Sequence, residues 1–228
     1  LSDAEIVNVD QSLSVLGDLN AQFLAPEGLD TSFYRARYPG IEIRRVPDTH
    51  LESIASYNEW ITRSEFYEPY LDFEFLAVVQ TDAALLRNLG VLDLESIDFL
   101  GAPWPCGLRY TQLGGRLIVS DQCSTPAMNL NSILPRLVGR TAWVGNGGLS
   151  VRRVTAFVTA TRNLRRQMKG YVAQGLNEDI IFATAGVDAG LRVPSVELAR
   201  SVFREHVTLA CARNLNLVGV HAPFSSGT

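Results

Sequence analysis

The stretch WVGNGGLSVR, from Trp143 to Arg152, places three glycines within four positions. Glycine loses more backbone entropy on folding than any other residue, so such a cluster is unfavourable unless the backbone or a close neighbour requires it. The pattern predicts a strand that runs into a tight glycine turn. The sequence therefore raises the question of which group approaches this backbone so closely that side chains are left out.

The glycine stretch differs from the common phosphate-binding and nucleophile loops. Counted from Gly145, the last position of a G-x-G-x-x-G pattern falls on Ser150, and the stretch lacks the lysine of a Walker loop. A G-x-S-x-G nucleophile elbow is also excluded, because Val151 and Arg152 follow Ser150. A hairpin whose positive-φ positions require Gly or Asn remains an alternative.

The composition is that of a globular protein, with 228 residues of which 46% are hydrophobic and 19% are charged. We expect a single domain over residues 1–228, because the sequence contains no internal repeat, low-complexity block or linker. The net charge of -4 provides no electrostatic footprint for nucleic acid, so we expect no nucleic-acid partner. No apolar run reaches the roughly 18 residues of a membrane span, so we expect no transmembrane segment.

The cysteines and the first residues bear on the setting of the protein. The three cysteines show no zinc spacing, and no signal-peptide pattern opens the sequence. The cytoplasm, or the inner face of the membrane that bounds it, is therefore the expected location. The chain opens with a helical pattern in which Ser2 and Glu5 can form a capping box. Because α/β domains usually open with a buried strand, we expect that the first strand is missing from this sequence.

The remaining pattern predicts strands that alternate with helices. Strands are expected at Ala21–Pro26, Ile41–Val46 and Phe75–Val79, and helices at Leu51–Tyr70 and Arg152–Gly170. The sequence therefore predicts an α/β protein.

Two further stretches matter for the site. The apolar run Phe75–Val79 is typical of a strand buried on both faces, and it ends at the polar cluster Gln80-Thr81-Asp82. Polar residues at the carboxyl end of such a strand are where α/β sheets bind ligands. The weakly patterned stretch from Gly107 to Arg140 favours a loop or lid. A helix is expected to begin after Asn177 as its N-cap.

Six motifs in this order resemble those of a bacterial and fungal glycosyltransferase-like family. The family is known mainly as a domain of unknown function and is related to the GT-A nucleotide-sugar transferases. The motifs are FYEPY (66–70), QTDAALL (80–86), DFLGAPW (98–104), VGNGGLSVR (144–152), NEDIIF (177–182) and VGVHAPF (218–224). The resemblance implies a single GT-A-like, Rossmann-like domain with a mixed central sheet flanked by helices. It also implies a nucleotide-sugar donor, a saccharide or glycolipid acceptor, and often a divalent metal, Mn²⁺ or Mg²⁺.

The QTD motif corresponds to the Asp-x-Asp motif of GT-A enzymes, in which the first acid faces the ribose and the second binds the metal. Here Gln80 occupies the first position and Asp82 the second. The resemblance implies that Gln80 and Thr81 contact the donor and that Asp82 holds the metal. The alternative is that Asp82 only caps a helix formed by the residues that follow it.

By the same resemblance, the glycine stretch lies against the donor sugar, with Asn146, Gly147 and Gly148 as donor contacts. This answers the question above provisionally, with a sugar ring packed against bare peptide. Tyr57 and Asn58 are expected, by analogy with the family, to contact the nucleotide base.

The NED motif supplies the expected catalytic acids. An inverting glycosyl transfer needs a carboxylate within about 3 Å of the acceptor hydroxyl, to take its proton. We expect Asp179 to be this base and Glu178 to position acceptor or sugar hydroxyls. The alternative is that both acids only complement the dipole of a helix N-terminus.

His221 matches the place of a C-terminal histidine that GT-A enzymes use on the metal or the diphosphate. A purely structural histidine is the alternative. Together the motifs predict a glycosyltransferase that moves a sugar from a nucleotide-diphosphate donor to a hydroxyl acceptor. The missing first acid makes a noncatalytic nucleotide-sugar binding domain the rival hypothesis. Either function requires the segments of Asp82, Gly147 and Asp179 to converge.

Overall fold

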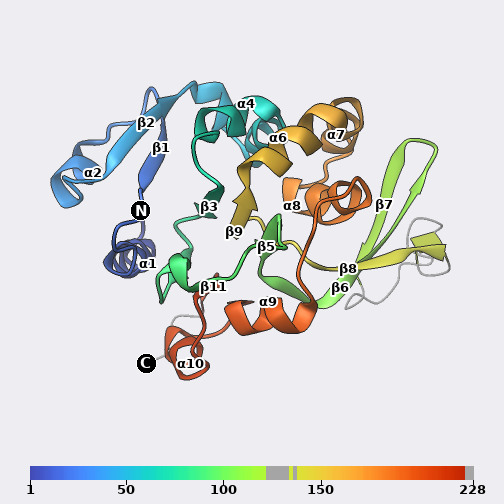
Figure 1. The fold of residues 1–228 in the computed structure, drawn as a ribbon. Coiled ribbons are helices and arrows are strands. Elements are labelled where there is room, and N and C mark those ends of the chain that lie inside the picture. Colours follow the sequence, from blue (N-terminus) through green and yellow to red (C-terminus); the bar gives the residue numbers. More distant parts are fainter. Residues whose placement is uncertain (122–133, 136–137, 224–228) are drawn as a thin grey trace.

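The structure is a computed structural model that describes residues 1–121, 134–135 and 138–223 (Figure 1). The helices are α1 (Asp3–Ser14), α2 (Ser32–Arg37), α3 (Ile54–Ile61), α4 (Ser64–Tyr67), α6 (Val154–Asn163), α7 (Arg165–Ala173), α8 (Glu178–Ile181), α9 (Val196–Val202) and α10 (Leu209–Asn214). Short helical turns are η1 (Asp48–His50), η2 (Glu68–Tyr70), η3 (Leu89–Val91) and the π-helical η4 (Phe182–Gly186). Across the described residues, every helix is too short or too polar to cross a lipid bilayer.

The strands fall into four small sheets within the described ranges. They are β1 (Gln22–Pro26), β2 (Glu42–Val46), β3 (Phe75–Val79), β4 (Ala83–Leu85), β5 (Phe99–Gly101), β6 (Pro103–Leu113), β7 (Arg116–Asp121), β8 (Arg140–Val144), β9 (Leu149–Arg153), β10 (Phe203–Glu205) and β11 (Gly219–His221). Their orders are β1-β2, β10-β11-β4, β3-β9-β5 and β7-β6-β8. The mixed α/β class is therefore confirmed, whereas the part of the chain that is described shows no single Rossmann-like central sheet.

The ladders are interrupted at residues 145–148, which we call the glycine loop. This segment between β8 and β9 touches the neighbouring strands through single hydrogen bonds. Asn146 N donates to Ala102 O at 3.2 Å, and Gln80 N donates to Gly148 O at 2.8 Å. The pairing of β6 with β8 also shifts register between Pro103 and Leu108. The glycine loop thus connects β8 of the β7-β6-β8 sheet to β9 of the β3-β9-β5 sheet.

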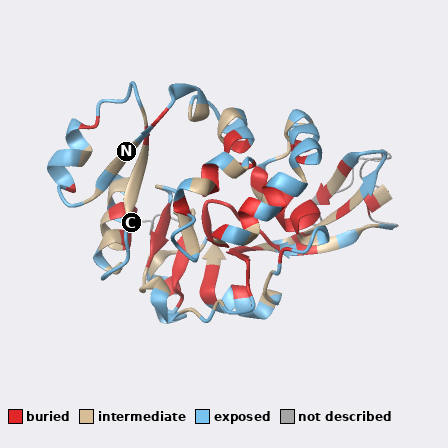
Figure 2. Ribbon diagram, turned by 45° about the horizontal axis from the view of Figure 1, so that its top comes forward, coloured by how far each residue is buried: buried red, intermediate tan, exposed pale blue. Residues whose placement is uncertain are grey.

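Strand β9 is the middle strand of the antiparallel β3-β9-β5 sheet, and its side chains alternate between two apolar clusters. Leu149 and Val151 lie in a cluster that includes Phe203. On the other face, the Arg152 guanidinium lies over the rings of Phe99 and Phe157. Figure 1 shows α4 and α6 on one side of this sheet and α9 on the other. Figure 2 shows that the buried segments gather around this sheet.

Several local predictions are confirmed. Strands β1 and β2 lie within the expected ranges Ala21–Pro26 and Ile41–Val46, and they pair in parallel. Helix α1 begins with the expected capping box, since Ser2 Oγ accepts from Glu5 N and Glu5 Oε2 accepts from Ser2 N. Strand β3 occupies the expected Phe75–Val79, although its residues are only partly buried.

The predicted loop or lid from Gly107 to Arg140 is wrong in its first part. Most of residues 107–121 belong to a hairpin of β6 and β7, whose turn contains Gly114 and Gly115 with φ of 57° and 75°. Glycine adopts such positive φ values without strain, and Gly-Gly is one of the favoured pairs in two-residue hairpin turns. Residues 122–133 and 136–137 of the predicted loop lie outside the described residues.

Two further predictions need correction. The expected helix Arg152–Gly170 begins only at Val154 and is divided into α6 and α7 at Leu164, so Arg152 ends up in β9. The residues after Asp82 form strand β4, which pairs antiparallel with β11, so Asp82 does not cap a helix.

The contact between β5 and the glycine loop gives a stability prediction. A Cβ added at Gly101 would lie 2.4 Å from the backbone oxygen of Asn146. Gly101→Ala is therefore expected to lower the free energy of unfolding by about 1–3 kcal/mol, as overpacked cores do. Gly40→Ala is the matched control, because a Cβ there meets nothing within 4 Å. Urea denaturation measures both variants, and equal losses would contradict the close approach at Gly101.

Candidate functional site

Segments far apart in the sequence meet at the glycine loop. A Cβ at Gly147 would lie 2.3 Å from Glu178 Oε1, at the start of α8. A Cβ at Gly148 would lie 2.4 Å from His221 Nε2 and 2.5 Å from Gln80 Oε1. His221 Nε2 in turn lies 3.5 Å from Asp82 Oδ1. The structure thus brings the QTD, glycine, NED and C-terminal motifs together.

The glycines are needed because the protein's own side chains fill the space beside them. Gly145 shows the same closeness, since its Cβ would lie 2.5 Å from Ala183 Cβ and 2.6 Å from the Trp104 ring. None of the loop's glycines has a positive φ, so the alternative of a hairpin that requires left-handed residues is excluded. The contact of this loop with a donor sugar remains a prediction.

Asn146 holds the loop in shape. Its Oδ1 accepts hydrogen bonds from Gly148 N at 2.9 Å and from Leu149 N at 3.2 Å. Its Nδ2 donates to Glu205 Oε1 at 2.5 Å. Side-chain oxygens of Asn commonly bond backbone amides two or three residues on and so stabilise turns. Asn146 is buried, and its hydrogen bonds to Gly148 and Leu149 stabilise the shape of the glycine loop.

A buried ion pair joins the loop to α8. Arg152 is fully buried and its Nη2 donates to Glu178 Oε1 at 2.9 Å. Arg152 also donates to Tyr67 Oη at 2.8 Å and to Ser150 Oγ at 3.0 Å. Burial lowers the pKa of Arg152, but the attraction of Tyr67 and Glu178 outweighs burial, so the guanidinium stays charged. The second oxygen of Glu178, Oε2, is buried without a hydrogen-bond partner.

The start of α8 is fixed by Asn58. Asn177 occupies the N-cap position as expected, but its side chain makes no capping hydrogen bond. Instead, Asn58 Oδ1 accepts from Glu178 N at 3.2 Å, and Asn58 Nδ2 donates to Asn177 Oδ1 at 2.9 Å. Asn58 is buried, so the structure gives it a positioning role. Its predicted contact with a nucleotide base is untested.

Tyr57 lies between the two ends of the site. Burial, and next the charge of Glu178, raise the pKa of Tyr57 well above its usual value. Its hydroxyl therefore stays protonated at neutral pH. Its predicted contact with the nucleotide base is likewise untested.

Asp179 has the electrostatic character of a base that works at neutral pH. Burial and the neighbouring charge of Glu178 raise its pKa to about 7. One of its oxygens, Oδ1, accepts from Ile180 N at 2.7 Å. A general base is most effective when its pKa lies near the working pH. The Asp179 carboxylate thus fits the role that the NED motif predicts.

His221 lies between two carboxylates at the other end of the loop. Its Nδ1 lies 3.2 Å from Glu205 Oε1, and its Nε2 faces the exposed Asp82. Burial lowers the pKa of His221, but the nearby carboxylates of Asp82 and Glu205 outweigh burial and raise it to about 9. His221 Nε2 is buried, and its 3.5 Å contact with Asp82 lacks hydrogen-bond geometry. The imidazole is therefore a cation at neutral pH.

Thr81 ties the QTD turn to the N-terminal helix. Its Oγ1 donates to Glu5 Oε1 at 2.5 Å, and its carbonyl accepts from Asn8 Nδ2 at 3.3 Å. The hydrogen bond from Thr81 is the largest of the effects that lower the pKa of Glu5 to about 2. Thr81 thus positions the turn, and a direct contact with the donor remains a prediction.

The two predicted metal ligands, Asp82 and His221, lie close together. Asp82 and His221 offer one carboxylate and one imidazole, and the described part of the chain holds no cluster of three or more His, Cys, Asp or Glu residues suited to a metal. Mg²⁺ sites in enzymes that act on nucleotides are often completed by substrate phosphates and water. Metal binding by this pair remains a prediction.

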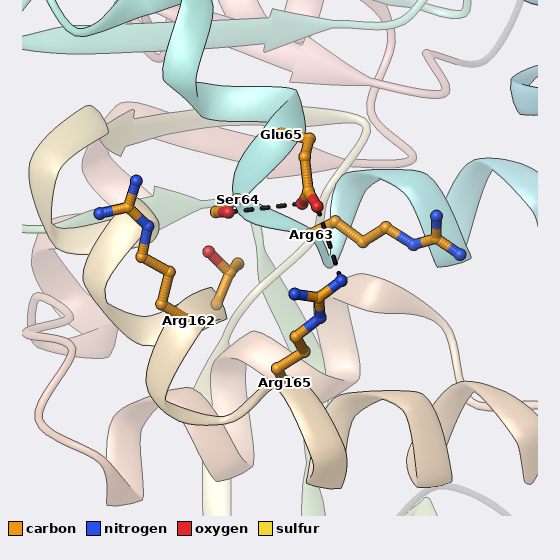
Figure 3. A pocket seen from close by; sticks show the side chains of 6 residues that line it. Arg63, Ser64, Glu65, Arg162 and Arg165 are labelled. Carbon is orange, nitrogen blue, oxygen red and sulfur yellow. Dashed lines mark hydrogen bonds and ion pairs between the residues drawn. The ribbon is translucent and has the colours of Figure 1, made fainter.

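Two cavities are lined by residues other than these. One, of about 160 Å³, is lined by Arg63, Ser64, Glu65, Thr161, Arg162 and Arg165. Figure 3 shows that Arg165 points toward Glu65, whereas the guanidinium groups of Arg63 and Arg162 point away from each other. The second, of about 150 Å³, is lined by Arg116–Val119, Gln174 and Leu176. The candidate site is therefore identified by the contacts between its side chains, and neither of these cavities belongs to it.

Sequence reasoning missed two residues that organise the site, Arg152 and Glu205. In the sequence, Ser150 and Arg152 alternate with the apolar Leu149 and Val151 of the same strand. Period-two alternation normally places polar residues on the exposed face of an antiparallel strand, so the pattern gave no indication that Arg152 is buried. Glu205 gave no signal, because its role depends on the pairing of β10 with β11.

The buried pair gives a second stability prediction. Arg152→Met leaves Glu178 buried without its cation, which is expected to cost about 3–5 kcal/mol of unfolding free energy. Adding Glu178→Gln to this variant is expected to recover part of the loss, because the uncompensated charge is then gone. Urea denaturation of the two single variants and the double variant measures the coupling. Additive losses would contradict a direct Arg152–Glu178 interaction. Arg165→Met, at the exposed pair with Glu65, is the control and should cause no measurable loss.

The raised pKa of Asp179 gives a pH prediction. The folded state holds the Asp179 proton up to about pH 7, whereas an unfolded Asp loses it near pH 4. Between these values the folded state binds more protons, so this residue makes stability fall as pH rises. Asp179→Asn should therefore gain stability relative to wild type from pH 4 to pH 7, and keep the gain above pH 7. Thermal unfolding across this range measures the difference, with Asp72→Asn at an exposed position as control. Parallel pH curves for wild type and Asp179→Asn would contradict the raised pKa.

Comparison with known proteins shows the family of this chain. No curated protein matches the chain. A family model described as "Protein of unknown function (DUF5672)" matches residues 40–221. The match spans all the candidate site residues from Tyr57 to His221 and leaves α1 outside. Because it covers well over half of the sequence, the chain belongs to the DUF5672 family.

Proposed function

We propose that this protein is a glycosyltransferase that moves a sugar from a nucleotide-diphosphate donor to a hydroxyl acceptor, with inversion. The observation that carries the proposal is that two buried polar atoms beside the glycine loop, Glu178 Oε2 and His221 Nε2, make no hydrogen bond, although His221 Nε2 lies 3.5 Å from Asp82 Oδ1. An unsatisfied buried polar group costs about 1–3 kcal/mol. Such groups persist where a ligand, an ion or water completes them. A donor that runs along the loop would supply partners for both atoms.

The His221 end of the loop suits the diphosphate. The His221 imidazolium attracts phosphate oxygens, and the exposed Asp82 lies beside it. Gln80, whose oxygen reaches Gly148, takes the ribose hydroxyl in this arrangement. Mn²⁺ or Mg²⁺ held by Asp82 and His221 would neutralise the diphosphate charge and displace the imidazole proton, because a ligating histidine must be neutral.

The Asp179 end of the loop suits the acceptor. The acceptor oxygen forms its bond to the anomeric carbon while the bond from that carbon to the diphosphate breaks. Asp179 takes the proton that the acceptor hydroxyl loses. Glu178 is held in place by Arg152, and its free oxygen Oε2 is the atom that positions a hydroxyl. The glycine loop holds the sugar between these two ends.

The resemblance to the GT-A transferases supports this proposal and the GT-A-like arrangement that it implies. The same resemblance suggests an acceptor among saccharides or glycolipids, in cytoplasmic assembly of polysaccharides at or near the inner face of the membrane. This setting rests on the analogy of fold and motifs, which is a weaker argument than one from the site itself.

A noncatalytic nucleotide-sugar binding domain is the second candidate. Gln80 replaces the first acid of the Asp-x-Asp motif, and only two predicted metal ligands meet. Such a domain would use the same loop and the same His221 cation to bind the donor without transferring its sugar.

Donor binding is the first test of the proposal. UDP- and GDP-linked sugars, each with and without Mn²⁺, are added to the protein and the melting temperature is measured, with CMP-linked sugars, which carry a single phosphate, as the comparison. A donor at 100 times its Kd stabilises the folded state by about 2.7 kcal/mol, so one class should raise the melting temperature. Asp82→Asn should remove the part of the shift that depends on Mn²⁺. No shift with any of these donors would overturn the proposal.

Turnover then separates the two candidate functions. Asp179→Asn should lower the rate by about 10²–10⁴-fold, which is the usual contribution of a general base. Its donor Kd should stay unchanged. The wild-type rate should rise with pH through about 7, as the Asp179 carboxyl loses its proton. Donor binding without turnover in the wild type, with any saccharide or glycolipid acceptor, would favour the binding domain.

A further inference from the structure

We propose that Glu205 is a positioning residue of the candidate site, whose single carboxylate oxygen orients the His221 imidazole and fixes the glycine loop together. Neither the family match nor the motifs point to Glu205. The inference rests on the proposed function for its effect on ligand binding, but not for its effect on His221 itself.

The fold places Glu205 directly beside His221. The two residues are register partners in the parallel pair of β10 and β11. The Glu205 side chain is only 9% exposed. Its Oε1 accepts from Asn146 Nδ2 at 2.5 Å and lies 3.2 Å from His221 Nδ1. One buried oxygen thus serves two partners that belong to different segments.

The first partner is the imidazole. A carboxylate on one ring nitrogen of histidine fixes the orientation and the protonation of the ring, and leaves the other nitrogen for its task. Here Glu205 takes Nδ1, so Nε2 is turned toward Gly148 and Asp82. Without Glu205 the ring can rotate, and Nε2 loses its fixed place at the loop.

The second partner is the glycine loop. Asn146 Nδ2 is held by Glu205, and Asn146 Oδ1 holds the amides of Gly148 and Leu149. The same amide side chain also lies 3.2 Å from His221 Nδ1. Loop shape and imidazole orientation are therefore set by one carboxylate, which acts through Asn146 and His221.

Two variants separate geometry from charge. Glu205→Gln keeps an oxygen at the same reach but removes the charge, whereas Glu205→Asp keeps the charge but is one methylene too short to serve both partners. A positioning role predicts that Glu205→Asp is damaging and Glu205→Gln is mild. A purely electrostatic role predicts the reverse order. Glu197→Ala, an exposed acid on α9, is the control.

The first readout is the ¹H–¹⁵N NMR spectrum of the His221 imidazole in the ligand-free protein, assigned by its loss in His221→Gln. We expect one fixed, hydrogen-bonded Nδ1 in wild type, Glu205→Gln and Glu197→Ala, and an averaged ring signal in Glu205→Asp. An unchanged ring signal in Glu205→Asp, in a protein whose melting temperature shows that it is folded, would overturn the inference.

The second readout is calorimetric titration with UDP. Loss of a residue that orients a ligating group costs about 10–100-fold in affinity. Glu205→Asp should therefore weaken the UDP Kd by at least about tenfold, and Glu205→Gln by much less. Equal Kd values for Glu205→Asp and wild type would contradict the inference. If the wild type binds no UDP, the assignment of a uridine donor fails, whereas the imidazole spectrum still decides the role of Glu205.

Discussion

The buried guanidinium of Arg152 is the constraint on which the rest of the structure depends. A charge without access to water must be met by hydrogen bonds and an opposite charge, or the fold loses several kcal/mol. Tyr67, Ser150 and Glu178 meet it here, and the carbonyl of Gly147 lies 3.4 Å from the same group. These partners come from α4, from α8 and from the continuous segment of the glycine loop and β9, so one cation joins three segments that are far apart in the sequence.

The convergence has electrostatic consequences at both ends of the glycine loop. Glu178 is buried in its ion pair with Arg152, and its neighbour Asp179 is buried beside it. Burial and the charge of Glu178 raise the pKa of Asp179 to about 7. At the other end, two carboxylates make His221 a cation, with a pKa of about 9. The glycine loop thus has an acidic pair, Glu178 and Asp179, near Gly147 and the His221 cation near Gly148. Among the described residues, Glu178 Oε2, His221 Nε2 and Arg109 Nε are buried without a hydrogen-bond partner, and the first two of these lie beside the glycine loop.

The sequence correctly predicted several features that depend on a local pattern of a few residues. The capping box at Ser2, the strands β1 and β2 and the polar end of β3 follow from spacing and period over a few residues. The glycine cluster correctly indicated a close approach, but the neighbours proved to be the protein's own side chains. Arg152 and Glu205 could not be predicted, because their burial and partners depend on pairings between residues up to 85 positions apart. The hairpin of β6 and β7 was missed although two glycines mark its turn.

The most direct test of the account is an NMR titration of the ¹⁵N-labelled protein with UDP, GDP and CMP sugars. If the Arg152 network builds one ligand site, the backbone amides of Gly147, Gly148 and Asp179 should shift together, with the same Kd, for at least one donor. Shifts confined to the arginine-lined cavity around Arg162, or no shift at the glycine loop with any donor, would contradict the claim that these segments converge to bind a ligand.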